Sequence, residues 1–293
     1  MRVVIDTNSL QSDELRAFLS ADYNNMAVLP EHTIVEIFKP AKLEAVWSSF
    51  EVLRDYPSQI LQLKSNRDAA DTDVTFPGFA NRFVDEPTSR EMPMFIELLR
   101  RAVGGDESYA AQIAQRREWA LERLDRATAA FGDIADQLAA VRSQFDPADL
   151  TKLAKEERTS QEFKLIILKL TDEIVNDIWR QRRSKPGPKG SAKHNDFTWR
   201  YVLCHLLQLL RLSASGNVRR KPSRAVNDHM DNVFATYGTY FNGLMTHDAE
   251  ANETHVVGRI MLDNIGVRIP PDYKESGYML SVIDWIESSE AGQ

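Results

Sequence analysis

Apolar residues near the start of the chain follow the spacings of buried strands and amphipathic helices. Val3, Val4 and Ile5 form a continuous run of β-branched residues, which predicts a strand that is buried on both faces. Ser12 and the two acids after it are typical of a helix start. A second strand is expected at residues 26–29, with a helix near residues 32–39. This alternation predicts an α/β fold, with a parallel sheet flanked by helices.

The pattern returns near the end of the chain. Apolar residues at helical spacing predict a helix through residues 226–237, and Leu244, Met245 and Thr246 form a short expected strand. A further helix is expected around residues 256–261, followed by an edge strand around residues 267–269. Both ends of the chain are therefore expected to supply strands and helices to one α/β unit.

The middle of the chain has helical periodicity. Apolar residues that alternate steps of three and four predict a long helix, and this seam consists of Leu124, Ala127, Phe131, Ile134, Leu138, Val141 and Phe145. A second long helix is expected over residues 163–178, and the run 197–212, apolar nearly all round, predicts a buried helix. The seam permits a homo-oligomer and equally fits an intramolecular hairpin. We therefore divide the chain into an α/β domain formed by 1–55 and 222–293 and a mostly α-helical insertion at 56–221.

The net charge of −7 conceals a strongly basic segment. Residues 180–224 hold twelve basic residues and one acid, a net of +11, so the remainder carries −18. This local excess favours nucleic acid as a partner, and the simpler alternative is a solvated face paired with acids elsewhere. The candidate nucleic-acid contacts are Arg182, Arg183, Lys185, Lys189, Arg219, Arg220, Lys221 and Arg224. Within this segment, the Pro and Gly residues of 182–193 predict a flexible loop.

The composition, with 43% hydrophobic and 27% charged residues, is that of an ordinary globular protein. The lone Cys204 lies in an apolar run and is expected to be a small buried side chain, which fits a reducing compartment. Asp6 interrupts any secretory signal, and the longest apolar stretch, residues 201–210, is too short to span a membrane. We therefore expect a cytoplasmic protein with no membrane association.

Four acids occupy positions that a parallel sheet would bring together. Asp6 directly follows the first strand and Asp248 follows the strand at residues 244–246, and ligands bind at the carboxyl ends of parallel strands. Glu36 lies on the helix after the second strand. Asp231 lies on the helix before the last of these strands, with Asp228 three residues earlier on the same face. Such carboxylates suit Mg²⁺ or Mn²⁺, and without metal their mutual repulsion is expected to raise the pKa of at least one of them.

Each acid also has a simpler interpretation. Asp6 is equally a turn residue after a strand, Asp248 a cap for the next helix, and Asp228 an acid at a helix start. Glu36 alone is uninformative, because surface helices are rich in glutamate. His247 is a candidate proton shuttle, although a surface residue at a strand end is the simpler expectation. The order of the four acids along the elements is much rarer than any one member, so the joint pattern favours a metal site.

Two segments resemble a known family. The opening Val3-Val4-Ile5-Asp6-Thr7-Asn8 is similar to the start of PIN-domain ribonucleases, which include toxin nucleases of the VapC type. The stretch from Asn227 to Asp231, followed by the Gly-Leu-Met-Thr-His-Asp of residues 243–248, resembles the closing helix, strand and Thr-x-Asp of that family. The resemblance implies catalytic and metal-binding roles for Asp6, Glu36, Asp231 and Asp248, with Asp228 as a further metal ligand and Thr7, Asn8 and Thr246 in support.

The resemblance covers roughly residues 1–50 and 222–265. It departs from compact family members because about 190 residues separate Glu36 from the third acid, where those members have a short helical segment. The third acid aligns with Asp231 or with Asp228. We favour Asp231, since its 17-residue distance to Asp248 is closer to the usual spacing.

The resemblance implies a metal-dependent endoribonuclease that hydrolyses phosphodiester bonds, with Mg²⁺ or Mn²⁺ as cofactor and RNA as substrate. It leaves open an antitoxin or other protein partner. Two alternatives remain, a nuclease-inactive PIN-like scaffold that binds RNA or a protein, and a DNA-directed nuclease of similar fold. The sequence has no zinc-type Cys/His spacing, no Walker loop and no Gly-x-Ser-x-Gly motif. Trp199, Tyr237 and Tyr240 are candidates for stacking on bases, but core packing is the simpler expectation.

Overall fold

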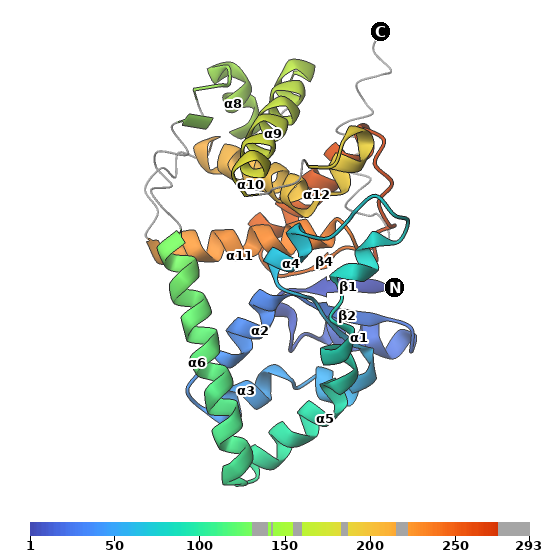
Figure 1. The fold of residues 1–293 in the computed structure, drawn as a ribbon, viewed down its shortest axis with the longest axis vertical. Coiled ribbons are helices and arrows are strands. Elements are labelled where there is room, and N and C mark those ends of the chain that lie inside the picture. The colour runs from blue at the N-terminus through green and yellow to red at the C-terminus, as the bar shows by residue number, and fades with distance from the viewer. Residues whose placement is uncertain (131–139, 142, 155–159, 183–186, 215–221, 275–293) are drawn as a thin grey trace.

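Four short parallel strands lie at the centre of the computed structural model, which describes residues 1–130, 140–141, 143–154, 160–182, 187–214 and 222–274 (Figure 1). The strands are β1 (Arg2–Ile5), β2 (Met26–Leu29), β3 (Ile60–Gln62) and β4 (Leu244–Met245), in the spatial order β3-β2-β1-β4. β1 pairs in parallel with β2 on one side and with β4 on the other. The fold is α/β, as the sequence predicts, and both ends of the chain contribute to one sheet.

The central strand β1 brings the two ends of the chain together. Its residues Val3 to Ile5 are fully buried, which explains the continuous apolar run. The register places Val4 opposite Leu244 and Ile5 opposite Met245. Because parallel strands end at the same edge of a sheet, Asp6 and Thr246 leave that edge next to each other.

Helices surround this sheet, and a further group of helices extends the molecule along its long axis (Figure 1). The α-helices are α1 (Asp13–Ala21), α2 (Glu31–Phe38), α3 (Leu43–Ser49), α4 (Asn66–Ala70), α5 (Glu86–Val103), α6 (Glu107–Ala130), α8 (Pro147–Ala154), α9 (Gln161–Arg182), α10 (Phe197–Ala214), α11 (Pro222–Gly238) and α12 (Ala249–Asn264). Short 3₁₀-helices lie at Thr7–Ser9, Leu53–Asp55, Pro57–Gln59, Phe79–Phe83 and Gly190–Asn195. No helix in the described ranges has both the length and the apolar character that crossing a membrane requires.

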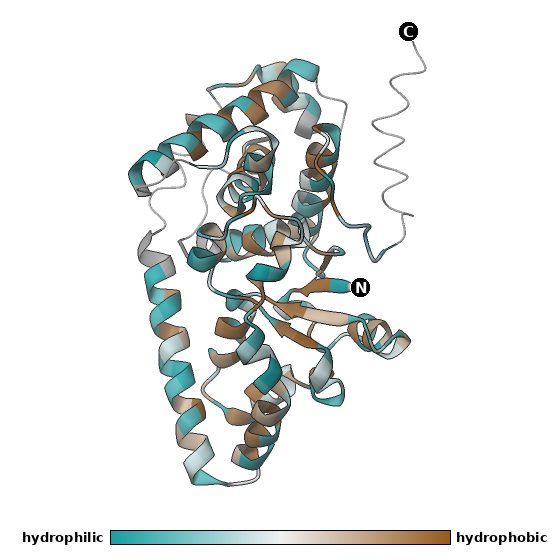
Figure 2. Cartoon of the chain, turned by 45° about the vertical axis from the view of Figure 1, so that its right-hand side comes forward, coloured by the Kyte–Doolittle hydropathy of each residue, from teal (hydrophilic) through white to brown (hydrophobic). Residues whose placement is uncertain are grey.

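Alternate residues of β1 belong to different hydrophobic cores, because successive side chains of a strand point to opposite faces of the sheet. Val3 and Ile5 pack in a core that also contains Phe18 of α1 and residues of α2, α3, α5 and α6. Val4 packs in a second core with Phe234 and its neighbours on α11. Figure 2 shows the apolar strands in brown, with helices around them. The sheet is therefore covered on both faces, as a buried parallel sheet requires.

The helix α10 is the buried helix that the apolar run predicts. Leu203 and Cys204 have no solvent-accessible surface, and α10 packs against α9, α11 and α12. Trp199 belongs to a third core that joins α9, α10 and α12 to α8. Tyr237 and Tyr240 are buried in the second core. Core packing is thus confirmed for the three aromatic residues that were candidates for stacking on bases.

Two sequence predictions are wrong. Residues 267–269 form no strand, because Val267 packs into the third core while the chain runs on into two prolines, which lack the N–H groups of a strand ladder. The basic loop is also more ordered than expected over its second half. Residues 190–195 form a 3₁₀-helix, and Lys193 makes an ion pair of 2.6 Å with Asp172 of α9. Residues 183–186 of the same loop lie outside the described part of the chain.

The long helices of the middle region are confirmed in part. α9 corresponds to the helix expected at 163–178, and α6 contains the start of the apolar seam. The seam positions from 131 to 138 lie outside the described residues. The structure adds one strand that the sequence did not indicate, since β3 lies inside the range 56–221 and pairs with β2.

Candidate functional site

Asp6 is held at the carboxyl end of β1 by a hydrogen bond from the neighbouring strand. The Thr246 hydroxyl donates to Asp6 Oδ2 over 2.6 Å, and only 5% of Asp6 is exposed. Burial raises the pKa of the Asp6 carboxyl, and the charges of Glu36 and Asp248 raise it further. Hydrogen bonds, chiefly the one from Thr246, oppose this effect without cancelling it. The Asp6 carboxyl is therefore fixed in position and electrostatically costly to ionise.

The Thr246 hydroxyl also organises the residues around it. It accepts a hydrogen bond of 2.9 Å from the Asp248 amide and lies 3.4 Å from Asn8 Nδ2. Asn8 Oδ1 accepts the His247 amide over 3.0 Å. These contacts join the segment after β1 to the segment after β4. Thr7 differs, because its hydroxyl is buried without a hydrogen-bond partner among the described residues.

Helix α2 places Glu36 at the same edge of the sheet. The Thr33 hydroxyl donates to the Ile5 carbonyl over 3.1 Å, which fastens α2 to the end of β1. Ile34 and Ile37 are buried and fix the rotation of the helix. Glu36 follows Thr33 by three residues and so lies one turn further along the same side.

Helix α11 carries Asp228 and Asp231. Val233 and Phe234 bury one side of this helix in the core that covers the sheet. Asp228 is well inside α11, which begins at residue 222, so its interpretation as a helix-start acid is wrong. Burial is the largest cause that raises the pKa of Asp231 to about 8, followed by Asp248 and the other nearby acids. The expectation that at least one acid has a raised pKa is confirmed.

Asp248 serves the fold as well as lining the candidate site. Its Oδ1 accepts a hydrogen bond of 2.9 Å from the Ala251 amide, so Asp248 is the N-cap of α12. This is the simpler interpretation of Asp248, and it is confirmed. The same side chain borders the cavity that Asp6 lines. The same carboxylate therefore caps α12 and lines the cavity.

Two substitutions of Asp248 measure the contribution of the cap to stability. Asparagine caps helices about as well as aspartate, whereas alanine costs about 1 kcal/mol at an N-cap. Since neither replacement carries charge, we expect Asp248→Ala to be about 1 kcal/mol less stable than Asp248→Asn. Urea denaturation of the two variants measures this difference, and equal free energies of unfolding would contradict the cap.

The predicted acids surround one open cavity of about 350 Å³. The cavity is lined by Asp6, Asn8, Glu36, Asn227, Asp228, Met230, Asp231, Phe234, Asp248 and Glu250. None of these described lining residues is basic. As they are placed, no three acidic, histidine or cysteine side chains within the described ranges lie close enough to share a metal ion. The structure thus gathers all four predicted acids around one space but leaves their carboxylates apart.

Glu250 and the apolar wall were not predicted as parts of the site. Glu250 lies in the first turn of α12, where acids are common because they complement the helix dipole, so its position alone does not mark it. Met230 and Phe234 have the spacing of core residues on α11 and are largely buried. Only the tertiary arrangement shows that their edges border the cavity.

Two histidines next to the acids carry no charge at neutral pH. His32 lies one turn before Glu36, and its ring centroid is 5.5 Å from that of His229 on α11. Burial lowers the pKa of His32 to about 4, and burial together with neighbouring histidines lowers the pKa of His229 to about 3. Neither ring therefore offsets the negative charge of the cavity. His247 is exposed, as the simpler interpretation expects.

The basic segment is only partly described. Of the expected nucleic-acid contacts, Lys189 has a described side chain, and it is exposed. The side chains of the others, Arg182, Arg183, Lys185, Arg219, Arg220, Lys221 and Arg224, lie outside the described part. Some cations of the segment serve the fold instead, since buried Arg200 donates to the Thr239 carbonyl over 2.7 Å and Arg211 pairs with Glu253. The local charge of +11 therefore overstates the positive charge that is available to bind a ligand.

The chain matches no protein-family model, no curated protein and no solved structure. Its function therefore has to be inferred from the residues of the cavity and from the sequence pattern that brings them there.

Proposed function

We propose that this protein is a divalent-metal-dependent nuclease of the PIN-domain type that cleaves RNA. The observation that carries the proposal is the gathering of Asp6, Glu36, Asp231 and Asp248 around one cavity at the carboxyl edge of a parallel sheet. Two of these acids come from the first 36 residues of the chain and two from residues beyond 230. A fold that brings carboxylates together from such distant positions at electrostatic cost suggests a positive ligand between them.

The donor set suits Mg²⁺ or Mn²⁺. The charged groups that line the cavity are carboxylates, and these cations prefer oxygen ligands. The raised pKa of Asp231 reflects the cost of holding several acids together without a counter-charge. A divalent cation would remove this cost. We therefore expect the carboxylates, which stand apart in the structure, to draw together when the cation binds.

A bound cation would supply a water that is activated near neutral pH and would stabilise charge on the phosphate. The chain's own residues would hold the reacting groups. Asp6, fixed by Thr246, provides a rigid ligand at the back of the cavity. Asp231 holds a proton at neutral pH and has to release it on becoming a ligand. Met230 and Phe234 form the apolar part of the wall.

RNA is the substrate we favour, because the PIN segments that the chain resembles belong to ribonucleases. Arg219, Arg220 and Lys221 directly precede α11 in the sequence, and α11 carries two of the acids. Such cations would hold backbone phosphates while hydrolysis proceeds at the acids. In this proposal the α-helical middle of the chain selects the RNA.

Replacing Thr246 tests whether its hydroxyl supports the metal site. Thr246→Val keeps the shape of the side chain but removes the donor to Asp6 and the acceptor of the Asp248 amide. We expect Mn²⁺ affinity to fall by about 10- to 100-fold, as for other residues that orient metal ligands. Thr246→Ser keeps the hydroxyl and is expected to bind Mn²⁺ nearly as well as wild type. Titration of the metal-free proteins with Mn²⁺ decides, and equal affinities of the two variants would exclude this role.

The proposed activity is tested with end-labelled RNA and single-stranded DNA of the same sequence. Each is incubated with purified protein in Mg²⁺, in Mn²⁺ or in excess chelator. We expect RNA to be cleaved with either metal, cleavage to stop in chelator, and Asp248→Asn to be inactive although folded.

The other outcomes separate the alternatives. Cleavage of DNA in preference to RNA would support the DNA-directed nuclease. Tight RNA binding without cleavage in either metal would support the nuclease-inactive scaffold. Cleavage that persists in chelator would contradict the proposal.

A further inference from the structure

Helices α11 and α12 pack against each other and carry acids at the end of their contact that faces the cavity. Asp231 lies on α11 and Asp248 caps α12, and both side chains line the same cavity. The positions of these two carboxyl groups relative to each other depend on how α12 packs against α11.

Two buried side chains of α12 supply such contacts further along the interface. His255, 1% exposed, follows Asp248 by two helical turns, and its Nδ1 lies 3.3 Å from the Ala235 carbonyl of α11. Gly238 lets the helices approach closely, since a Cβ atom there would lie 2.6 Å from His255 Nδ1. Arg259, one turn beyond His255, points its guanidinium at the Gly238 and Phe241 carbonyls at 3.5 and 3.4 Å.

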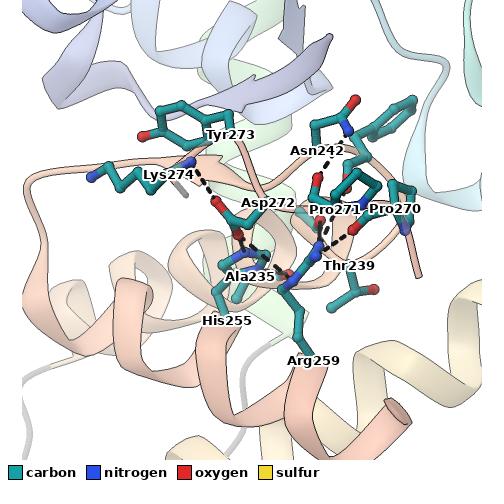
Figure 3. A network of polar contacts seen from close by, with 12 residues as sticks. Ala235, Thr239, Asn242, His255, Arg259, Pro270, Pro271, Asp272, Tyr273 and Lys274 are labelled. Carbon is teal, nitrogen blue, oxygen red and sulfur yellow. Dashed lines mark hydrogen bonds and ion pairs between the residues drawn. The ribbon is translucent and has the colours of Figure 1, made fainter. Parts of the chain in front are cut away.

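Asp272 places a negative charge between these two side chains (Figure 3). Its Oδ2 lies 3.5 Å from His255 Nε2 and 3.6 Å from Arg259 Nε. Burial alone would raise the pKa of Asp272, but His255, the Lys274 amide and Arg259 together bring it below its ordinary value. Asp272 is thus an anion that neutralises the buried guanidinium, and it comes from a different part of the chain than α11 or α12.

The segment 270–273 that carries Asp272 is also fixed to the start of β4 (Figure 3). Asn242 Nδ2 donates to the Pro271 carbonyl over 2.9 Å, and the Tyr273 amide donates to the Asn242 carbonyl over 2.8 Å. Gly243 has a φ of +112°, and a Cβ there would lie 2.8 Å from the Asp272 carboxylate. The same segment therefore touches the strand that leads to Thr246 and the helix that begins at Asp248.

We propose that segment 270–273 is a clamp that sets the distance between Asp231 and Asp248, with Asp272 and His255 as positioning residues for the metal site. This inference rests on the proposed function. The clamp holds the part of α12 around His255 and Arg259 against α11 and against the residues that directly precede β4. Asp231 and Asp248, at the end of this helix contact that faces the cavity, are thereby kept on the same cavity, where a cation would draw them together.

The clamp is tested by the affinity of the metal-free full-length protein for Mn²⁺, measured from the electron paramagnetic resonance signal of free Mn²⁺. Asp272→Asn keeps the shape of the side chain but removes its charge. We expect it to raise the Mn²⁺ dissociation constant about tenfold, the lower end of the range for residues that orient metal ligands. At saturating Mn²⁺ the cleavage rate and the KM for RNA are expected to return to wild-type values, which a partly unfolded protein would not show.

A neighbour in the same segment provides the control. The Tyr273 hydroxyl donates to Glu14 of α1 over 3.0 Å and has no part in the contact with α12. Tyr273→Phe therefore loosens the segment at its other anchor, and we expect its Mn²⁺ affinity to stay within about twofold of wild type, a difference under 0.5 kcal/mol. Equal weakening by Tyr273→Phe and Asp272→Asn would show that the segment only stabilises the fold and would overturn the inference.

A second variant covers the case in which Asp272→Asn does not fold. His255→Ala leaves Asp272 and Arg259 in place but removes the contact with the Ala235 carbonyl, and we expect it to weaken Mn²⁺ binding in the same direction. A folded variant of either kind with wild-type affinity would overturn the clamp alone. A wild-type protein that does not bind Mn²⁺ would remove the proposed function, and the inference with it.

Discussion

Asp6→Asn is expected to lower the rate of RNA cleavage by about a thousand-fold. Metal-assisted stabilisation of the reacting phosphate contributes several kcal/mol, and about 4 kcal/mol corresponds to three factors of ten in rate. Asparagine has the same shape as aspartate, and its side-chain oxygen can still accept the hydrogen bond from Thr246. The fold should therefore persist while the negative charge of the ligand is lost. Single-turnover cleavage at fixed Mg²⁺ measures the effect.

The matched control for this variant is Asp13→Asn, which removes an exposed acid in the first turn of α1. We expect its cleavage rate to equal that of wild type. An Asp6→Asn enzyme that retains more than about a tenth of the wild-type rate would mean that the missing charge contributes less than about 1.4 kcal/mol, too little for a metal ligand.

Asp231→Asn is expected to abolish cleavage and yet to stabilise the metal-free fold. The pKa of Asp231 is raised from its ordinary value of 3.8 to about 8, so the folded protein binds a proton more tightly than the unfolded chain does. The stability of the wild type therefore falls as pH rises from about 4 to about 8, and it stays low above that range. Asparagine cannot ionise, so the variant is expected to lack this loss.

The size of this effect follows from the pKa. A change from 3.8 to about 8 corresponds to about 6 kcal/mol, and because the side chain is partly exposed we expect about half of this. Urea denaturation at pH 5 and pH 9 in chelator measures it, with Asp125→Asn, an exposed acid of α6, as the control. Saturating Mn²⁺ is expected to reverse the order, because it stabilises the wild type by binding the folded state. A variant that is no more stable than wild type at pH 9 would contradict the repulsion among the acids.

Much of the sheet could be predicted because its strands carry a strong local signal. The continuous run of Val3, Val4 and Ile5 is typical of a strand that is buried on both faces, and β1 is such a strand. Asp6 and Asp248 follow from the same signal, since an acid after a buried parallel strand lies at the edge where ligands bind, whereas Glu36 and Asp231 lie on helices. The roles of Glu36 and Asp231 were predicted only from the order of the four acids along the elements and from the resemblance to PIN-domain segments.

The missed elements have weak or misleading local signals. β3 has only three residues and pairs with β2 along one edge, so no alternation of apolar and polar residues marks it. Residues 267–269 look like a strand because Val267 and Ile269 are apolar, yet both serve the third core, and no neighbouring strand lies there to pair with them in the described structure. Hydrophobicity alone cannot distinguish a buried segment without a strand partner from a true strand.

The cavity itself contains residues that no local pattern could assign. Glu250 looks like an ordinary helix-start acid. Outside the cavity, the contact between His255 and Asp272 likewise depends on how the chain turns after α12. The composition of the basic segment, by contrast, overestimated the positive charge that is available to a ligand. Composition counts Arg200 as free charge, whereas the structure buries it against backbone carbonyls.

Crystals of the protein grown metal-free and soaked in Mn²⁺ test the central claim most directly. An anomalous difference map locates manganese without assuming where it binds. We expect a peak inside the cavity within ligand distance of the Asp6 and Asp248 carboxylates, and no such peak in Asp6→Asn crystals treated in the same way. Soaked wild-type crystals in which manganese is absent from the cavity would contradict the account.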